Sequence, residues 1–252
     1  MKHKKILAFL RICLILFSLG FLWQLIIWIF QFPVYLLPAP LTVIQTLFQQ
    51  MPLIGSQIIP TLTEILLGLM FGTLFGMTSA IILIYFRPAR LWFMPILLIS
   101  QALPTFAIAP ILVVWFGYGM ATKIITTIIM LFFPITNAFY DGLKNTNPQW
   151  INLAQTMNAS PWQILWHVKI PAALPSFATG LRVATAIAPI GAIVSEWVGA
   201  SRGLGFLMLN ANARLQIDLM FAVLLIIIAL TLSLYFSIDR LLHWLIPWEK
   251  WK

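Results

Sequence analysis

A few charged and polar side chains lie inside long apolar runs, and these are the residues of this sequence that could do chemistry. Glu64, Arg182 and Glu196 all lie within such runs. A charge inside a bilayer is costly, so it indicates a pathway, a gate or a paired group. Arg182 lies about 9 Å from the end of its run, which favours a side chain that snorkels to lipid phosphates. Glu196 is expected near the outer mouth, either as a carboxylate in interfacial water or as part of a pathway or gate.

Prolines next to polar residues indicate where a path for a solute could run. Proline frees a backbone carbonyl, and such breaks are tolerated where protein or a water-filled cavity satisfies that group. Pro104 has Gln101 and Thr105 beside it, and Ser195 and Trp197 flank Glu196. Trp197 could stack on a flat heterocycle. The predicted translocation path therefore comprises Gln101, Pro104, Thr105, Ser195, Glu196 and Trp197. The alternative is that these side chains face lipid or neighbouring helices.

The sequence offers little for catalysis or metal binding. It contains no G-x-x-x-x-G-K-[ST] loop for ATP phosphates, no H-E-x-x-H pair and a single cysteine, Cys13. Its histidines are scattered at His3, His167 and His243. Six carboxylates leave little for an acid–base pair or a proton relay. We therefore expect no enzyme activity, no cofactor and no metal. No nucleophile–base or metal constellation for an intramembrane enzyme stands out. A secondary transporter would need ion-coupling groups near the middle of the membrane, and the sequence offers almost none.

Composition places the chain in a membrane. Of its 252 residues, 62% are hydrophobic and only 8% are charged, whereas soluble domains carry about 25% charged residues. The net charge of +9 comes from basic residues at the ends of apolar runs, which favours headgroup contact over nucleic-acid binding. The first apolar run, from Ile6 to about Phe32, is too long for a signal peptide and is expected to remain as a span.

Hydropathy predicts an all-α membrane protein with six transmembrane helices in one domain, residues 1–252. A span needs about 20 apolar residues. The predicted spans lie near residues 8–30, 58–85, 92–116, 122–140, 176–197 and 219–246. The stretch from Leu36 to Gln57 fits a short amphipathic segment at the interface. Glycines at 68, 72 and 76 fall at four-residue spacing, which favours close helix packing.

The basic residues indicate the orientation of these six spans. With the N-terminus in the cytoplasm, the cytoplasmic segments contain 11 Lys and Arg residues: Lys2, Lys4, Lys5, Arg11, Arg87, Arg90, Lys144, Lys169, Arg240, Lys250 and Lys252. The outer segments contain three, Lys123, Arg202 and Arg214. Because cytoplasmic loops are enriched in Lys and Arg, we predict that both termini are cytoplasmic.

The longest cytoplasmic connection, residues 141–175, carries helix punctuation. Asn147-Pro148 fits an N-cap followed by the first helical position, and residues 148–157 have helical periodicity. Asn158 fits a left-handed C′ position. Ser160-Pro161 then starts a second short helix through about His167. The functional interpretation is a rigid plug that docks into another protein and transmits force. The alternative is an ordinary helical loop.

The same connection resembles the "EAA" loop of ABC-importer permeases, whose pattern is E-A-A, three residues, G, nine residues, I-x-L-P. The matching positions are Asn152, Leu153, Ala154, Asn158, Val168, Ile170 and Pro171. The chain departs from the pattern at Asn152, where the acidic residue is missing, at Leu153 and at Asn158. The resemblance implies that this loop couples the chain to an ATPase, although not through a salt bridge from position 152.

Further segments resemble permeases of the nitrate, sulfonate and taurine type; they include L-P-A-P at 37–40, W-F-G-Y-G at 115–119, P-A-A-L-P at 171–175 and G-L-G at 203–205. A-P-I-G-A at 188–192, E-W-V-G at 196–199 and N-A-N-A-R at 210–214 look most similar to permeases for pyrimidine precursors of thiamine.

This resemblance implies a type I ABC importer permease in the bacterial inner membrane. Its implied partners are a dimer of ATPase subunits, a periplasmic or lipid-anchored substrate-binding protein and a second permease copy. The implied substrate is a hydroxymethylpyrimidine-type thiamine precursor, with sulfonate, taurine or nitrate as the alternative.

Overall fold

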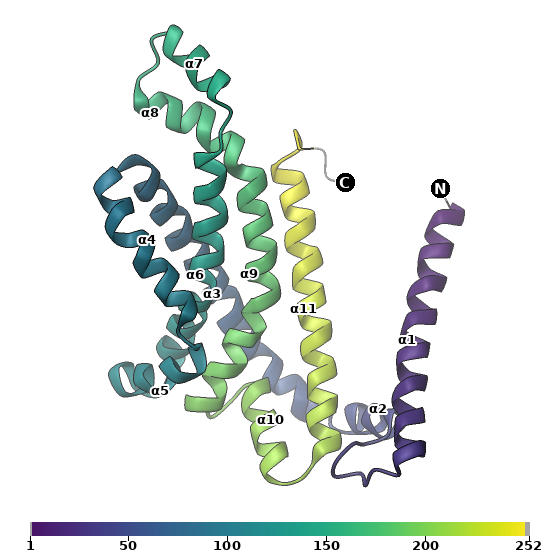
Figure 1. The fold of residues 1–252 in the computed structure, drawn as a ribbon. Helices are drawn as coiled ribbons and strands as arrows, with labels where there is room; N and C mark the ends of the chain where they lie inside the picture. The colour runs from purple at the N-terminus through teal and green to yellow at the C-terminus, as the bar shows by residue number, and fades with distance from the viewer. Residues whose placement is uncertain (1, 250–252) are drawn as a thin grey trace. The chain divides into compact units, whose positions relative to one another are not determined.

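In a computed structural model the chain is built from helices (Figure 1). The structure describes residues 2–249, apart from the side chains of residues 2–9, 12, 13, 16, 87, 101 and 102. The helices are α1 (Lys2–Phe30), α2 (Pro40–Gln49), α3 (Met51–Tyr85), α4 (Arg87–Ala102), α5 (Thr105–Phe116), α6 (Met120–Lys144), α7 (Pro148–Thr156), α8 (Pro161–Ile164), the π-helical η1 (Leu165–Lys169), α9 (Ile170–Gly199), α10 (Leu204–Ala213) and α11 (Ile217–Leu245). This part of the chain confirms the predicted all-α class.

The chain divides into two compact units. The first comprises residues 1–57 and 207–226, and the second comprises residues 58–206 and 227–252. In the first unit, the Thr46 hydroxyl donates to the Asp218 carboxylate over 2.8 Å, and the rings of Trp23 and Phe221 lie 5.4 Å apart. The short helix expected between Leu36 and Gln57 is present as α2, although α3 already begins at Met51.

Four helical segments of the described chain are long and apolar enough to cross a membrane. They are Met51–Tyr85, Met120–Lys144, Pro161–Gly199 and Ile217–Leu245. Each contains one of the predicted spans or matches it within a residue or two. The helix of α1 covers the predicted first span, but its described apolar stretch is limited to Phe17–Phe30. A crossing of the membrane by α1, which would bring the number to six, therefore stays a prediction.

The expected single span at 92–116 is broken. Its two halves, Pro88–Ser100 and Thr105–Phe116, are bent by 103°. Leu103 separates them in an extended conformation, with φ −76° and ψ 122°. The ring of Pro104 disfavours helical geometry for the residue before it, so the break falls at Leu103. The two halves together make a fifth broken span or a re-entrant loop.

The core of the second unit forms where α3, α6 and α9 pack together (Figure 1). Leu131, Ile135 and Phe139 of α6 are fully buried there. A Cβ on Gly76 of α3 would lie 2.7 Å from Cγ2 of Ile135, so only glycine allows this approach. Gly68 meets Thr127 in the same way. The predicted role of the glycine ridge in helix packing is confirmed.

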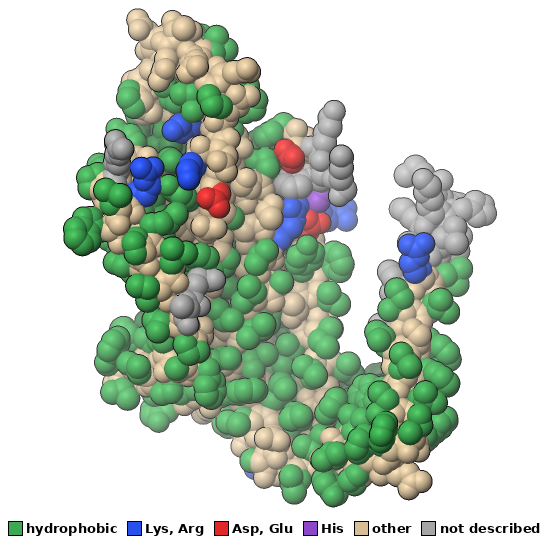
Figure 2. Space-filling view, in the orientation of Figure 1, with side chains coloured by type: hydrophobic (Ala, Val, Ile, Leu, Met, Phe, Trp, Pro, Cys, Tyr) green, Lys and Arg blue, Asp and Glu red, His purple; other side chains and the backbone are tan. Residues whose placement is uncertain are grey.

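The surface of the second unit is apolar along its helices. Hydrophobic side chains cover the flanks of α4, α5 and α11, whereas charged side chains gather toward the end that carries α7 and α8 (Figure 2). The exposed apolar residues include Trp92, Val114 and Phe236. A surface of this kind is stable in lipid rather than in water.

Candidate functional site

Residues 147–169, here named the α7–α8 segment, form a capped helix–turn–helix at one end of the second unit. The Gln149 N–H donates to Oδ1 of Asn147 over 2.9 Å, which satisfies one free donor at the start of α7. Pro148 occupies the first turn, where its missing N–H has no consequence. The predicted start of this helix is confirmed.

The turn between the two helices is equally well specified. Asn158 is left-handed, with φ +60°, and the Ala159 N–H donates to the Ala154 carbonyl over 3.0 Å. Ser160 and Gln163 then form a reciprocal capping box: the Gln163 N–H donates to the Ser160 hydroxyl, and the Ser160 N–H donates to Oε1 of Gln163 over 2.8 Å. Asn158 takes the C′ position that the sequence predicts.

The second helix differs from the prediction because it does not stop near His167. Instead α8 passes through the π-helical η1 directly into α9, giving one helical segment from Pro161 to Gly199. The Ile170 N–H donates to the Leu165 carbonyl, a wider spacing than in an α-helix. This wider turn accommodates Pro171, which lacks an N–H, without a break.

An apolar face of the α7–α8 segment is exposed. Trp150, Leu153 and Met157 are 53%, 62% and 75% exposed, and α7 and α8 project beyond the ends of α6 and α9 (Figure 1). A groove of about 610 Å³ runs beside this face and is lined by Trp150, Leu153, Ala154, Met157, His167, Val168, Pro171, Ala172, Pro175, Trp248 and Glu249. Exposed apolar area at a projecting helix is typical of a protein-docking surface.

The predicted coupling residues lie in three places: the groove, the exposed surface and the edge of the core. Leu153, Ala154, Val168 and Pro171 line the groove. The side chains of Asn152 and Asn158 are exposed. Ile170 is half-buried and packs against the core of the second unit.

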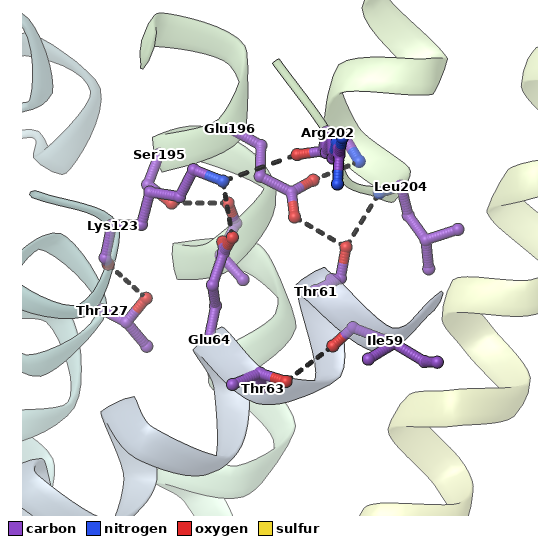
Figure 3. Close-up of polar contacts among 12 residues, drawn as sticks. Ile59, Thr61, Thr63, Glu64, Lys123, Thr127, Ser195, Glu196, Arg202 and Leu204 are labelled. Atoms are coloured by element: carbon purple, nitrogen blue, oxygen red, sulfur yellow. Dashed lines mark hydrogen bonds and ion pairs between the residues drawn. The ribbon is translucent and has the colours of Figure 1, made fainter. Parts of the chain in front are cut away.

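A polar cluster lies at the opposite ends of α6 and α9; it comprises Thr61, Glu64, Lys123 and Glu196 (Figure 3). Nζ of Lys123 lies 2.6 Å from Oε1 of Glu64, and both side chains are buried. Lys123 is therefore not an outer-loop residue, as its place in the charge count implies, but a buried residue in the first turn of α6. The opposite charge compensates the desolvation penalty that either group would have if it were buried alone.

Glu196 is held by backbone and hydroxyl donors. The Thr61 hydroxyl donates to Oε1 over 2.6 Å, and the Gly205 N–H donates to Oε2. Gly203 has φ +124°, and a Cβ there would overlap the Glu196 carboxylate. Only 1% of Glu196 is exposed, so the alternative of a carboxylate in interfacial water is wrong, and its pathway or gate role stays a prediction.

The other predicted path residues lie at two places in the second unit. Ser195 is buried and donates to the Ala192 carbonyl over 2.7 Å, whereas Trp197 is 40% exposed. Pro104 and Thr105 lie at the break between α4 and α5, and α5 packs against α9. The side chain of Gln101 lies outside the described residues. A role for these residues on the path stays a prediction.

Arg182 does not snorkel as expected. Its Nε lies 2.6 Å from Oδ1 of Asp239 on α11, and its side chain is 15% exposed. Asp239 also lies 3.5 Å from Nδ1 of His243. The sequence carries no local signal of this pairing, because Arg182 and Asp239 are 57 residues apart.

The described residues form helices long and apolar enough to cross a membrane and a projecting α7–α8 segment, and the sequence comparison assigns the family. Residues 68–250 match the family described as binding-protein-dependent transport system inner membrane component. The chain belongs to this family.

Individual relatives are consistent with that family. A probable ABC transporter permease protein of Haemophilus influenzae is 53% identical, with 93% of this chain and 96% of the relative covered. The formylaminopyrimidine transport permease protein ThiX of Halalkalibacterium halodurans is 36% identical over 86% of this chain and 87% of its own. The taurine transport system permease protein TauC of Escherichia coli is 32% identical over 75% and 69%.

Solved structures agree in fold. An inward-facing MetNI methionine ABC transporter chain superposes with a TM-score of 0.67 at 22% identity, covering 77% of this chain and 97% of that chain. A crystal structure of an amino acid ABC transporter gives a TM-score of 0.63 at 18% identity, covering 81% and 98%. The chain thus has the type I importer fold. Its family and relatives show that it is a multi-pass inner-membrane protein and an ABC importer permease.

Proposed function

We propose that this permease is driven by an ATPase dimer that docks on the α7–α8 segment. The observation that carries the proposal is the exposed apolar face of a segment that is otherwise rigidly capped. Leu153 and Met157 project from a helix whose two ends are fixed by Asn147 and Asn158. A rigid segment continuous with α9 can pass a displacement of its partner into the membrane, whereas a flexible loop cannot. ATP hydrolysis belongs to the separate subunit.

The orientation follows from the same docking. We propose that the α7–α8 segment and both termini are cytoplasmic, supported by the 11 basic residues that this arrangement places inside. Two permease copies would form the pore, and a periplasmic or lipid-anchored binding protein would deliver the solute to the outer face. The name of the matching family supports this last partner.

The proposed substrate is a hydroxymethylpyrimidine-type thiamine precursor. The 36% identical relative named for formylaminopyrimidine transport supports this choice. The alternative substrate class, taurine, other sulfonates or nitrate, is supported by the taurine permease at 32% identity. An ATP-independent secondary transporter is the remaining, less favoured alternative, since the described carboxylates offer few ion-coupling groups.

The proposed path for the substrate uses the break between α4 and α5. Pro104 and Thr105 lie at this break, where backbone carbonyls leave the helical ladder. Trp197 offers an aromatic face for a flat heterocycle. Ser195 and Glu196 direct their polar atoms to partners inside the protein, so we propose that they support the path from behind it.

The docking proposal is tested on the apolar face of α7. Leu153→Glu places a charge on the proposed interface and is expected to abolish ATP-dependent uptake and co-purification of the ATPase. Asn152→Glu is the matched control: it adds the same charge one residue away, at the position where related loops are acidic, and should leave both intact. Uptake that survives Leu153→Glu, or that persists without any ATPase, would contradict the proposal.

The substrate proposal needs a separate experiment. Cells that express the complete transporter should accumulate radiolabelled hydroxymethylpyrimidine and not radiolabelled taurine. The cognate binding protein should bind the same pyrimidine in a calorimetric titration. Binding of taurine with no binding of any pyrimidine would assign the alternative class.

A further inference from the structure

The segment at residues 200–206, which joins α9 to the first turn of α10, is fixed by side chains from three different helices (Figure 3). Thr61 of α3 accepts a hydrogen bond from the Leu204 N–H over 2.8 Å. Glu196 of α9 accepts from the Gly205 N–H. Lys123 of α6 donates to the Arg202 carbonyl at 3.5 Å. All three contacts are made to backbone atoms of the segment. They therefore fix the course of its backbone regardless of its exposed side chains.

The segment fits its anchors closely. A Cβ on Gly205 would lie 2.8 Å from Oε2 of Glu196, and Gly203 meets the same carboxylate. Leu204 between them is fully buried, whereas Ser201 and Arg202 are exposed. The two glycines therefore form a cradle for the Glu196 carboxylate, and a movement of the segment would strip that carboxylate of its donors.

Thr61 is the central anchor because its hydroxyl makes two hydrogen bonds at once. It donates to Glu196 and accepts from Leu204. The glycine contacts between α3 and α6, together with the buried pair of Glu64 and Lys123, leave these helices little room to separate. An opened segment would expose buried donors and a carboxylate in a poorly hydrated interior.

We propose that Thr61, Lys123 and Glu196 are positioning residues for transport. They hold the 200–206 segment against α3, α6 and α9, so that Ser201 and Arg202 move with these helices as one body and not as a free flap. The proposal rests on the transport function and is independent of which substrate is carried. None of the three residues needs to touch the solute.

The experiment compares three variants of the full-length permease in lipid nanodiscs. Thr61→Val keeps the shape of the side chain and removes both hydrogen bonds, Thr61→Ser keeps the hydroxyl, and Thr63→Val removes a hydroxyl on the same helix that donates only to the Ile59 carbonyl. Hydrogen–deuterium exchange of a peptide containing residues 200–206 is read without substrate or partner. Uptake by the complete transporter is then measured per inserted protein.

The expected result is specific to Thr61→Val. Exchange in the 200–206 peptide should rise about tenfold, as the loss of one or two buried hydrogen bonds predicts, and the maximal uptake rate should fall at an unchanged half-saturating concentration. Thr61→Ser and Thr63→Val should behave as wild type. Unchanged exchange in Thr61→Val would overturn the proposed anchor, and faster exchange with an unchanged rate would overturn its role in transport.

A second variant keeps the proposal testable if Thr61→Val does not insert. Glu196→Gln retains the size of the side chain but replaces one acceptor oxygen by a donor, which opposes the Thr61 hydroxyl or the Gly205 N–H. Exchange in the same peptide should again rise, and an unchanged value would contradict the proposal. Because exchange needs no solute, a wrong substrate assignment leaves this result standing.

Discussion

Lys123 and Glu64 face each other across the α3–α6 contact with Nζ and Oε1 2.6 Å apart, and neither side chain has appreciable exposure. Oε2 of Glu64 is buried and makes no hydrogen bond to the described residues, so the pair depends on a single close contact. Two charges in this setting stabilise the fold only as long as both are present.

Removing one partner of this pair should be more damaging than removing both. Lys123→Met and Glu64→Gln should each destabilise the permease by about 3–5 kcal/mol, because each leaves a buried group uncompensated. The double variant should recover part of that loss, because the contact of Lys123 with the Arg202 carbonyl stays absent. Thermal unfolding in detergent of the wild type, the two single variants and the double variant measures this coupling. Losses of stability in the single variants that add up in the double variant would contradict a coupled pair.

The turn of the α7–α8 segment should respond to backbone preference at position 158. Asn158→Gly should be neutral, whereas Asn158→Ala should weaken the turn by about 1 kcal/mol, because alanine disfavours the left-handed φ of +60°. Limited proteolysis of residues 147–163 measures the effect. Equal protection of the glycine and alanine variants would argue against the left-handed turn.

The closeness of α3 and α6 predicts a strong effect at Gly76. Gly76→Ala should cost about 1–3 kcal/mol, because the new methyl group meets Ile135. Adding Ile135→Ala removes the opposing Cγ2 and should relieve the overlap. Gly55→Ala is the control, since nothing lies within 4 Å of a Cβ at that position. The measurement is the melting temperature of each variant. Equal losses of melting temperature for Gly76→Ala and Gly55→Ala would contradict the close packing of α3 and α6.

The pair of Arg182 and Asp239 should contribute less than the buried pair. Its side chains are 15% and 30% exposed, and solvent weakens the attraction. Arg182→Gln and Asp239→Asn should each lower stability by about 1 kcal/mol, with the double variant no worse than the poorer single one. A double variant that loses the sum of both would mean that the two residues act separately.

The sequence predicts most of the helical architecture because long apolar runs and helix caps are local signals. Asn147, Asn158 and Ser160 behave as their residue types indicate. Pro104 marks the position of the break at Leu103 in the sequence, but hydropathy does not report how sharply a helix bends at a proline.

The polar cluster is less accessible to sequence reasoning. Lys123 sits at the edge of an apolar run, where a lysine in water and a lysine paired inside the protein give the same pattern. Thr61 lies 135 residues from Glu196, and a contact of that range leaves no local trace. The one available signal was the pair of glycines at 203 and 205 shortly after a carboxylate inside a span.

The continuous helical segment from Pro161 to Gly199 connects the α7–α8 segment to the buried Glu196 within the second unit. Its 39 residues extend over about 58 Å. Hydrogen bonds along its axis resist both compression and stretching, so an axial displacement of the α7–α8 segment is carried along the helix toward Glu196. The π-turn at η1 and the prolines at 175 and 189 are the joints where such a rod can flex. A displacement applied at the proposed docking face would therefore travel along this one helix toward the buried polar cluster.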